Sequence, residues 1–192
     1  MVSIKFGTDG WRGIIAKDFT FRNVALASQG VADYVREEGL GAQGIVIGYD
    51  TRFASEAFAE QVAQVLTGNG IKAYLANKAC PTPVITYNVI EHNSAGGIII
   101  TASHNPPQWN GFKFRPKNSG SATPQVTAYL DHAIKQASQT GVKSMDIDLA
   151  RKDGLVEYID PMAPYLQKIA SIVDLSIISD SEMDIVTDAM YG

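Results

Sequence analysis

The sequence predicts an α/β protein built on a mostly parallel sheet. Short apolar runs of strand length alternate along the chain with longer segments whose apolar residues recur at helical spacing. Glycine, proline and asparagine separate the two kinds of segment. Because a strand, a helix and a second strand in succession form a parallel unit, this alternation favours one layered α/β sheet.

The predicted strands lie in three apolar runs and two shorter segments. The runs cover residues 45–49, 71–75 and 96–100. In residues 112–114 a lysine lies between two phenylalanines, and this alternation is typical of a strand with different faces. Three glycines within residues 7–13 indicate a tight turn, and we expect strands to flank it.

Apolar stripes and end signals predict five helices. Thr20 and the pairs Thr82-Pro83 and Thr123-Pro124 are typical of helix starts, and residues 68–70, Gly-Asn-Gly, are typical of a helix end. The helices are expected at 20–35, around 58–66, at 82–90, at 123–137 and from 160 to about 173. In the last helix we expect the following side chains to be buried: Tyr165, Leu166, Ile169, Ile172 and Val173.

The end of the sequence predicts a second unit. Residues 139–153 are polar and indicate a connector, and residues 185–187, Ile-Val-Thr, have the pattern of a first strand. A lone strand cannot form a domain. We therefore expect a fragment of a longer protein, with one domain at 1–145 and the connector, helix and first strand of a second domain at 146–192.

Composition narrows the classes of function. Of the 192 residues, 45% are hydrophobic, enough for a folded core, and the net charge of −4 gives no general attraction to nucleic acid or to an anionic membrane. Cys80 is the only cysteine, so no internal disulfide can form, and the three histidines show no ligand spacing. No apolar run approaches the roughly 18 residues of a membrane span, and the first 13 residues lack a signal-peptide core. We expect a cytoplasmic protein without nucleic-acid or membrane partners.

Ser103 is the first candidate functional residue. It follows a buried strand, in a polar loop from Thr101 to Asn110, and an Asn110-Gly111 turn is expected after it. Taken alone, such a serine most often bonds its own backbone. The functional alternative is a nucleophile or phosphate carrier, which needs nearby cations. His104 is adjacent, and because neighbours in an extended loop point in different directions, it suits a phosphate contact better than a Ser–His dyad.

Three cations could serve that serine. Lys113 is either a solvated strand residue or, through the short connection from the loop, a neighbour of Ser103 that neutralises charge or relays a proton. Arg12, in the glycine-rich turn, either packs on Trp11 or clamps a phosphate, and the residues favour neither. Arg52 follows a strand end together with Asp50; a local ion pair is the ordinary interpretation, and a place in the site is the alternative.

Four motifs in order resemble the α-D-phosphohexomutases, which include phosphoglucomutases and phosphomannomutases. The most specific is Ile-Thr-Ala-Ser-His-Asn-Pro-Pro at 100–107 with Asn-Gly-Phe-Lys at 110–113, which resembles the family's phosphoserine loop. The others are Phe-Gly-Thr-Asp-Gly-Trp-Arg-Gly at 6–13, Gly-Tyr-Asp-Thr-Arg at 48–52 and Pro-Thr-Pro at 81–83. The resemblance runs to the end of the chain, where Thr187 to Gly192 resemble the opening of the family's second domain.

The resemblance implies a fold and a reaction. The fold is a three-layer α/β/α domain with a four-stranded mixed sheet whose last strand, at 112–114, is antiparallel. Ser103 would be the phosphoserine that exchanges its phosphoryl group with a hexose phosphate through a bisphosphorylated sugar. Lys113 and Arg12 match positions that assist proton transfer and steady the phosphoryl group, and His104 matches a contact to the loop phosphate. Trp11 stands where many relatives have a small aliphatic residue, which leaves open whether the sugar is glucose, mannose or glucosamine.

The resemblance also implies partners outside this sequence. In the family a Mg²⁺ ion bridges the phosphoserine to an Asp-Gly-Asp-Gly-Asp loop of the second domain, so Ser103 would supply one metal ligand through its phosphate. That loop and the sugar-reading domains are absent from the sequence. We expect the fragment alone to be inactive, to act with the remaining domains of its own chain, and to be able to form a homodimer through an exposed interdomain face. The alternative function is a non-catalytic α/β module that binds phosphosugars or a partner.

Overall fold

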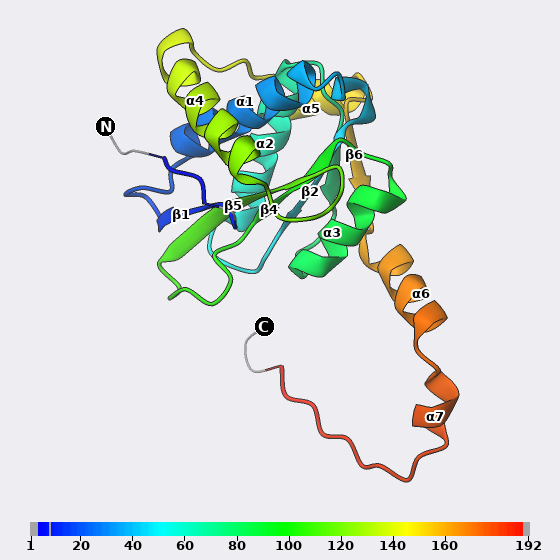
Figure 1. The fold of residues 1–192 in the computed structure, drawn as a ribbon. Coiled ribbons are helices and arrows are strands. Elements are labelled where there is room, and N and C mark those ends of the chain that lie inside the picture. The colour runs from blue at the N-terminus through cyan, green and yellow to red at the C-terminus, as the bar shows by residue number, and fades with distance from the viewer. Residues whose placement is uncertain (1–3, 8, 190–192) are drawn as a thin grey trace.

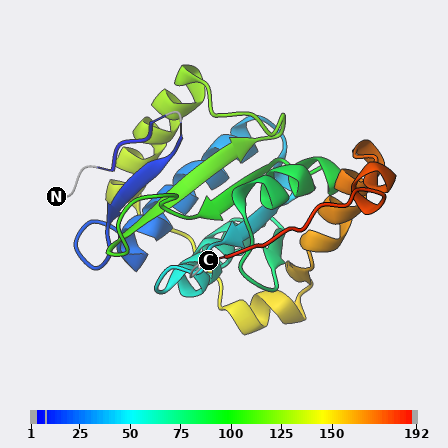
Figure 2. The ribbon, with the colours of Figure 1, turned by 90° about the horizontal axis from the view of Figure 1, so that it is seen from below.

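The computed structural model describes residues 4–7 and 9–189. Their strands form one central mixed sheet. The order of strands is β1-β5-β4-β2-β3-β6. Strands β4, β2, β3 and β6 are parallel, and β5 is antiparallel to both of its neighbours, β4 and β1 (Figure 2). The strands are β1 (Trp11–Ile14), β2 (Ile45–Tyr49), β3 (Ala73–Ala76), β4 (Gly96–Ile100), β5 (Trp109–Pro116) and β6 (Val156–Ile159).

The prediction of a four-stranded sheet is wrong, because a strand is added at each edge. At one edge β1 begins within the segment 7–13 that was predicted to be a turn, and it pairs with β5 from Trp11 to Ile14. At the other, β6 pairs with β3 and buries Val156 and Ile159 against the core. The antiparallel direction of the strand that contains Lys113 is confirmed.

Helices cover both faces of the sheet, as expected for an α/β/α domain (Figure 1). Helices α1, α2 and α4 pack together on one face, and α3 contacts β2 and β4 from the other. The helical elements are α1 (Phe21–Glu37), η1 (Gly41–Gln43), α2 (Ser55–Gly68), α3 (Thr82–Glu91), α4 (Pro124–Thr140), α5 (Ile147–Lys152), α6 (Met162–Ile172) and α7 (Leu175–Ser179). No helix in the described part of the chain is long and apolar enough to cross a membrane.

Two of the three threonines predicted to cap a helix are confirmed as N-caps, and α3 begins at Thr82 as predicted. The Thr20 hydroxyl accepts a hydrogen bond from the Asn23 amide at 3.2 Å, and Thr123 accepts one from Val126 at 3.4 Å. The prediction that Thr82 caps α3 is wrong, since Pro81 is the N-cap of α3 and Thr82 is already helical.

Thr20→Ala is expected to lower the free energy of unfolding by about 1 kcal/mol, because the Asn23 amide loses its acceptor. Chemical denaturation of the variant measures this change. Thr140→Ala, at the exposed end of α4, is the matched control and should change stability by less than about 0.5 kcal/mol. Equal effects of the two substitutions would contradict the capping role.

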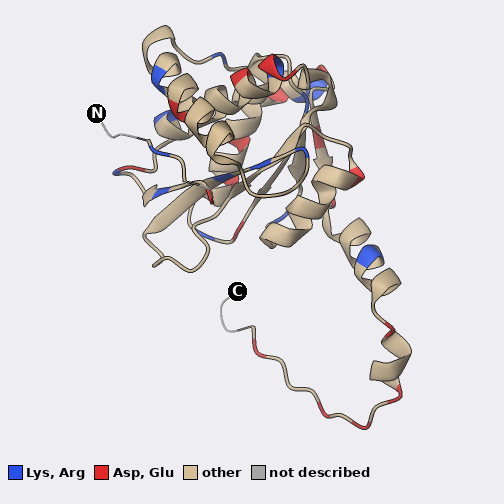
Figure 3. Ribbon diagram, in the orientation of Figure 1, with Lys and Arg blue, Asp and Glu red and all other residues tan. Residues whose placement is uncertain are grey.

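The C-terminal part leaves apolar side chains exposed, which contradicts the prediction that the last long helix is buried. No residue of α6 is buried; Leu166 is 55% and Ile172 65% exposed, because α3 is the main element of the described chain that α6 packs against. Residues 185–187 form no strand and have no neighbouring strand to pair with among the described residues. After Lys168 the charged residues are all acidic (Figure 3), and the segment that resembles the opening of a second domain ends in residues 190–192, outside the described residues.

The predicted domain division at residue 145 stays a prediction. Two elements beyond that position belong to the layered domain in this structure: α5 contacts α2, and β6 completes the sheet beside β3. The segment at 139–153, which was expected to be a polar connector, contains α5.

Candidate active site

The site forms at the edge of the sheet where β2 and β4 end and β5 begins. Parallel strands place the residues after their carboxyl ends side by side. Here these residues are Asp50 to Arg52 after β2 and the segment Thr101–Gln108 after β4, which we call the serine loop. The antiparallel β5 starts at the same edge with Trp109.

Ser103 lies exposed in the serine loop with a left-handed backbone conformation, φ +56°. Its amide donates to the Thr101 hydroxyl at 2.9 Å. Its Oγ lies 3.4 Å from His104 Nδ1, so the two side chains approach each other although they are adjacent in sequence. A non-glycine residue with positive φ is uncommon and needs surrounding contacts to hold it.

The predicted Asn110-Gly111 turn is wrong, because both residues lie within β5. The chain turns earlier, where the Trp109 amide donates to the Pro106 carbonyl at 3.0 Å. A Cβ at Gly111 would lie 2.5 Å from the Thr101 carbonyl oxygen and 3.0 Å from that of Trp11. Glycine is therefore required at this position by the close approach of neighbouring backbone, not by a turn.

Three cations gather on one face of β1 and β5 around Asp9. Its carboxylate lies 2.9 Å from Arg12, 3.1 Å from Lys113 Nζ and 3.1 Å from Arg115. The side chain of Lys113 is only 8% exposed, so the interpretation as a solvated strand lysine is wrong. Its neighbour Phe112 packs against Phe6, which fits the predicted alternation of faces.

Arg12 connects this cation cluster to the serine loop. Its Nη1 donates to the Asn105 side-chain oxygen at 2.6 Å, and its Nη2 bonds Asp9. A continuous path of contacts therefore runs from the loop through Arg12 and Asp9 to Lys113. The sequence analysis does not name Asp9 or Arg115 as site residues. The two are far apart in sequence, and only the folded sheet brings them into contact.

The charges around Asp9 affect its titration. Partial burial alone would raise the pKa of Asp9, but the hydrogen bond and charge of Lys113, with the charges of Arg115 and Arg12, lower the pKa below its ordinary value of 3.8. The carboxylate therefore stabilises the fold above the pKa of the unfolded chain, and this contribution is lost as the pH falls through the lower folded pKa.

Acid denaturation is expected to show this linkage. Between neutral pH and about pH 5 the contribution of Asp9 to stability should be constant, and it should decline at lower pH. Asp9→Asn removes the titrating group, so the stability difference between wild type and variant should shrink as the solution is acidified. A difference that stays constant down to about pH 2 would contradict the assignment.

A cavity of about 630 Å³ opens beside Ser103. Its walls come from the serine loop, the loop after β2 and the start of α3, and they include Arg52, the 78% exposed Phe53 and the buried Cys80. Burial raises the pKa of Cys80 to about 11, so the thiol stays protonated at neutral pH, as the interpretation of an inert cysteine requires. The lining includes Ser103 but not Arg12, Lys113 or His104, so the cation cluster borders the loop from another side.

Arg52 holds the serine loop by its backbone. Its guanidinium donates to the carbonyl oxygens of four loop and strand residues at 2.6–3.0 Å, namely Ser103, Asn105, Pro106 and Trp109. Asp50 forms the predicted ion pair with Arg52 at 3.3 Å. The sequence offers two interpretations of Arg52, an ion pair with Asp50 or a position in the site. In the structure Arg52 makes the ion pair and also contacts the serine loop.

The described residues do not by themselves make a magnesium site. No group of three or more His, Cys, Asp or Glu side chains within 4–7 and 9–189 is arranged to hold a metal ion. Asp50, the carboxylate that directly follows β2, is already bonded to Arg52 and to the Ser55 hydroxyl. A cation at Ser103 would thus depend on ligands other than these.

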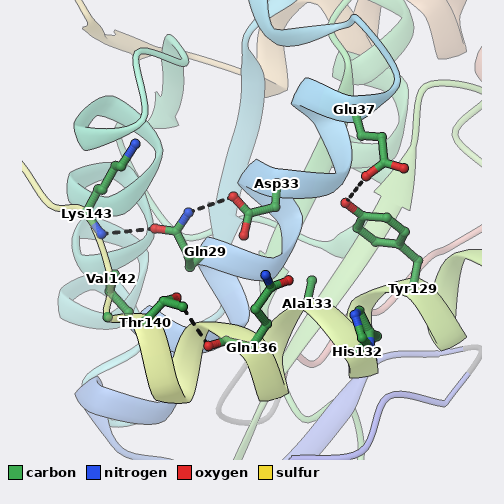
Figure 4. Close-up of a pocket in the computed structure, with 11 residues that line it drawn as sticks. Gln29, Asp33, Glu37, Tyr129, His132, Ala133, Gln136, Thr140, Val142 and Lys143 are labelled. Carbon is green, nitrogen blue, oxygen red and sulfur yellow. Dashed lines mark hydrogen bonds between the residues drawn. The ribbon is translucent and has the colours of Figure 1, made fainter.

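A second cavity, of about 640 Å³, lies between α1 and α4 (Figure 4). Its polar groups bond one another: Tyr129 donates to Glu37 at 2.6 Å, and Gln29 donates to Asp33 and accepts from the Lys143 amide. Burial and the contact with Glu37 raise the pKa of Tyr129, so it remains a neutral donor. The polar groups that line this cavity are therefore hydrogen-bonded to one another, as expected for a gap between two packed helices.

The fold and the site together define an α/β domain that presents a serine loop beside a cation cluster. The family described as phosphoglucomutase/phosphomannomutase, alpha/beta/alpha domain I, matches residues 3–141. This chain belongs to that family of α-D-phosphohexomutases and corresponds to its N-terminal domain.

Individual relatives agree. The phosphoglucomutase of Komagataeibacter xylinus is 30% identical over 98% of this chain and 36% of its own length, and the probable phosphomannomutase of Haemophilus influenzae is 36% identical over 88% and 34%. A Thermus thermophilus protein assigned as a phosphomannomutase has a solved structure that matches with a TM-score of 0.79 and 30% identity, over 92% of this chain and 38% of that one. The chain therefore spans about a third of the length of these relatives.

Proposed function

We propose that this chain is the phosphoserine domain of a phosphohexomutase, an enzyme that interconverts hexose 1-phosphate and hexose 6-phosphate. The observation that carries the proposal is Ser103 itself: an exposed hydroxyl, held in a left-handed conformation at the end of a buried strand, in a loop that Arg12 ties to two further cations. Phosphoryl transfer depends mainly on positioning and charge stabilisation, and this arrangement supplies both.

The proposed reaction exchanges one phosphoryl group between Ser103 and a sugar hydroxyl. The bond from phosphorus to the serine oxygen breaks, a bond to the sugar oxygen forms, and the proton leaves the sugar hydroxyl while the serine oxygen regains one. Arg12 and Lys113 neutralise the phosphate, Lys113 assists the proton transfer, and His104 contacts the loop phosphate. A second transfer from the bisphosphorylated sugar returns a phosphoryl group to Ser103.

Other parts of a longer protein would complete the site. Mg²⁺ in phosphohexomutases would supply charge stabilisation at the serine phosphate, with its other ligands outside this chain. The names of the relatives include a phosphoglucomutase, a phosphomannomutase and a phosphoglucosamine mutase, so we propose a hexose phosphate as substrate without choosing among glucose, mannose and glucosamine. On this proposal the 192 residues do not turn over substrate alone.

Mass spectrometry tests the carrier role. The complete enzyme, incubated with a hexose 1,6-bisphosphate, should gain the mass of one phosphate, and peptide mapping should locate it on Ser103. Phosphate found only on another residue would overturn the proposal.

The alternative is a non-catalytic module that binds phosphosugars, which the cavity of about 630 Å³ beside Ser103 favours. Calorimetry with this chain and glucose 6-phosphate separates the two functions. The mutase proposal expects weak or no binding by the chain alone, whereas tight binding without phosphorylation of Ser103 would favour the module.

A further inference from the structure

Arg52 makes an unusual set of contacts for a side chain outside the cation cluster. Its Nη2 donates to the carbonyl oxygens of Ser103 at 2.7 Å and Asn105 at 2.6 Å, and its Nη1 donates to those of Pro106 at 2.9 Å and Trp109 at 3.0 Å. All four acceptors are backbone atoms of one short segment. The Arg52 side chain is 15% exposed; its bonds to Asn105 and Trp109 are partly buried, and those to Ser103 and Pro106 lie at the surface.

The serine loop needs such a donor, because it supplies few of its own. Pro106 and Pro107 have no amide hydrogen, so this part of the loop cannot form an ordinary ladder of backbone hydrogen bonds. The bonds that the loop makes within itself include those from Asn105 to the Ala102 carbonyl and from Trp109 to the Pro106 carbonyl. Carbonyl oxygens that converge on one point repel each other. A guanidinium placed there reduces this repulsion by its positive charge and donates the hydrogen bonds that the loop amides do not supply.

Arg52 is itself fixed to rigid elements. Its Nε lies 3.3 Å from one oxygen of Asp50, and its amide donates to the other oxygen at 3.0 Å. That second oxygen also accepts from the Ser55 hydroxyl at 2.7 Å, and the Ser55 hydroxyl accepts from the Asn110 side chain at 2.9 Å. The guanidinium is therefore braced by the end of β2, the start of α2 and the start of β5.

We propose that Arg52 is a positioning residue that fixes the backbone of Ser103 and thereby the direction of its hydroxyl. This inference rests on the proposed function of Ser103 as phosphoryl carrier. Arg52 bonds the Ser103 carbonyl directly, and Ser103 keeps φ at +56°, a conformation that surrounding contacts must maintain. Arg52 acts through the loop backbone and does not need to touch the transferred phosphoryl group.

Hydrogen exchange on this chain tests the positioning without reference to the reaction. In Arg52→Met, which keeps the length of the stem and removes the donors, the amides of Ser103, Asn105 and Trp109 should exchange at least about tenfold faster. The amides of β2 and β4 should exchange as in wild type. Arg151→Met, at a 54% exposed arginine of α5, is the matched control and should leave the loop unchanged.

If Arg52→Met loses hydrogen-exchange protection in the whole domain, and not only in the serine loop, Arg52→Lys is the second variant that tests the inference. A lysine keeps the charge but offers three hydrogen atoms from a single nitrogen, so it cannot reproduce the four bonds of a planar guanidinium. Faster exchange in the serine loop with intact strands supports the inference in either variant. Wild-type exchange in the loop of both variants, or loss confined to the strands, overturns it.

Kinetics of the complete enzyme give the functional readout. Misplacement of a reacting group by about 1 Å costs roughly a hundredfold in rate, so Arg52→Lys should lower kcat by about that factor and leave KM for hexose phosphate within twofold. A kcat within threefold of wild type overturns the inference. If wild-type enzyme carries no phosphate on Ser103, the proposed function fails, whereas the exchange result still reports whether Arg52 holds the loop.

Discussion

Ser103→Ala is expected to abolish mutase activity, lowering kcat by at least about 10⁴-fold in the complete enzyme, because the substitution removes the hydroxyl that we propose as the phosphoryl carrier. The side chain is exposed, and among the described residues its hydroxyl approaches only His104, at 3.4 Å, so the fold should be unaffected. Coupled assays of hexose phosphate interconversion measure the rate, and denaturation measures the stability.

Ser138→Ala is the control for this experiment. Ser138 lies exposed on α4, where its hydroxyl bonds the Lys135 carbonyl, and its loss should leave both activity and stability near wild type. A Ser103→Ala enzyme that retains full activity would show that the serine loop does not carry the phosphoryl group.

Gly111→Ala is expected to destabilise the fold by about 3 kcal/mol. Gly111 lies in β5 between β1 and β4, and an added Cβ would approach the carbonyl oxygens of Thr101 and Trp11 to 2.5 and 3.0 Å. Both contacts are backbone atoms, one in β1 and one directly after β4, and both segments are hydrogen-bonded to β5, so they can move only if these bonds break. The shift should appear as a lower midpoint in urea denaturation.

Gly120→Ala separates this steric effect from the general cost of replacing glycine. Gly120 lies in the exposed segment before α4, and its nearest neighbour for a Cβ is an atom of the flexible Asn118 side chain at 3.5 Å. The control should stay within about 0.5 kcal/mol of wild type. Equal midpoints for the two variants would contradict the close approach at Gly111.

The strands in the centre of the sheet could be predicted from sequence, whereas β6 at one edge could not. Residues 45–49 and 96–100 are apolar throughout because β2 and β4 are buried on both faces. By contrast, β6 is four residues long and buries only Val156 and Ile159, so its pattern resembles that of a polar connector. The apolar stripe of α6 predicts a buried face, but in the described chain its main neighbour is α3, which leaves most of the stripe exposed.

The same distinction applies to the site. Ser103, Arg12, Lys113 and His104 could be named because their side chains stand in recognisable motifs, but their roles stay proposals. Arg52 was harder to place, since its four partners are carbonyl oxygens and every residue type provides one. A sequence shows which residues lack an amide hydrogen, such as Pro106. It does not show which distant side chain, here that of Arg52, donates hydrogen bonds to that part of the loop instead.

The grouping of cations around Asp9 has a consequence for charge balance. Three positive side chains share one carboxylate there, so these four side chains together carry a net charge of two positive units (3 − 1). A phosphoserine carries about −1.5 to −2 charges near neutral pH. If Ser103 is the carrier, its phosphorylation brings this corner of the molecule close to electroneutrality, and the free hydroxyl form is the one with unbalanced charge.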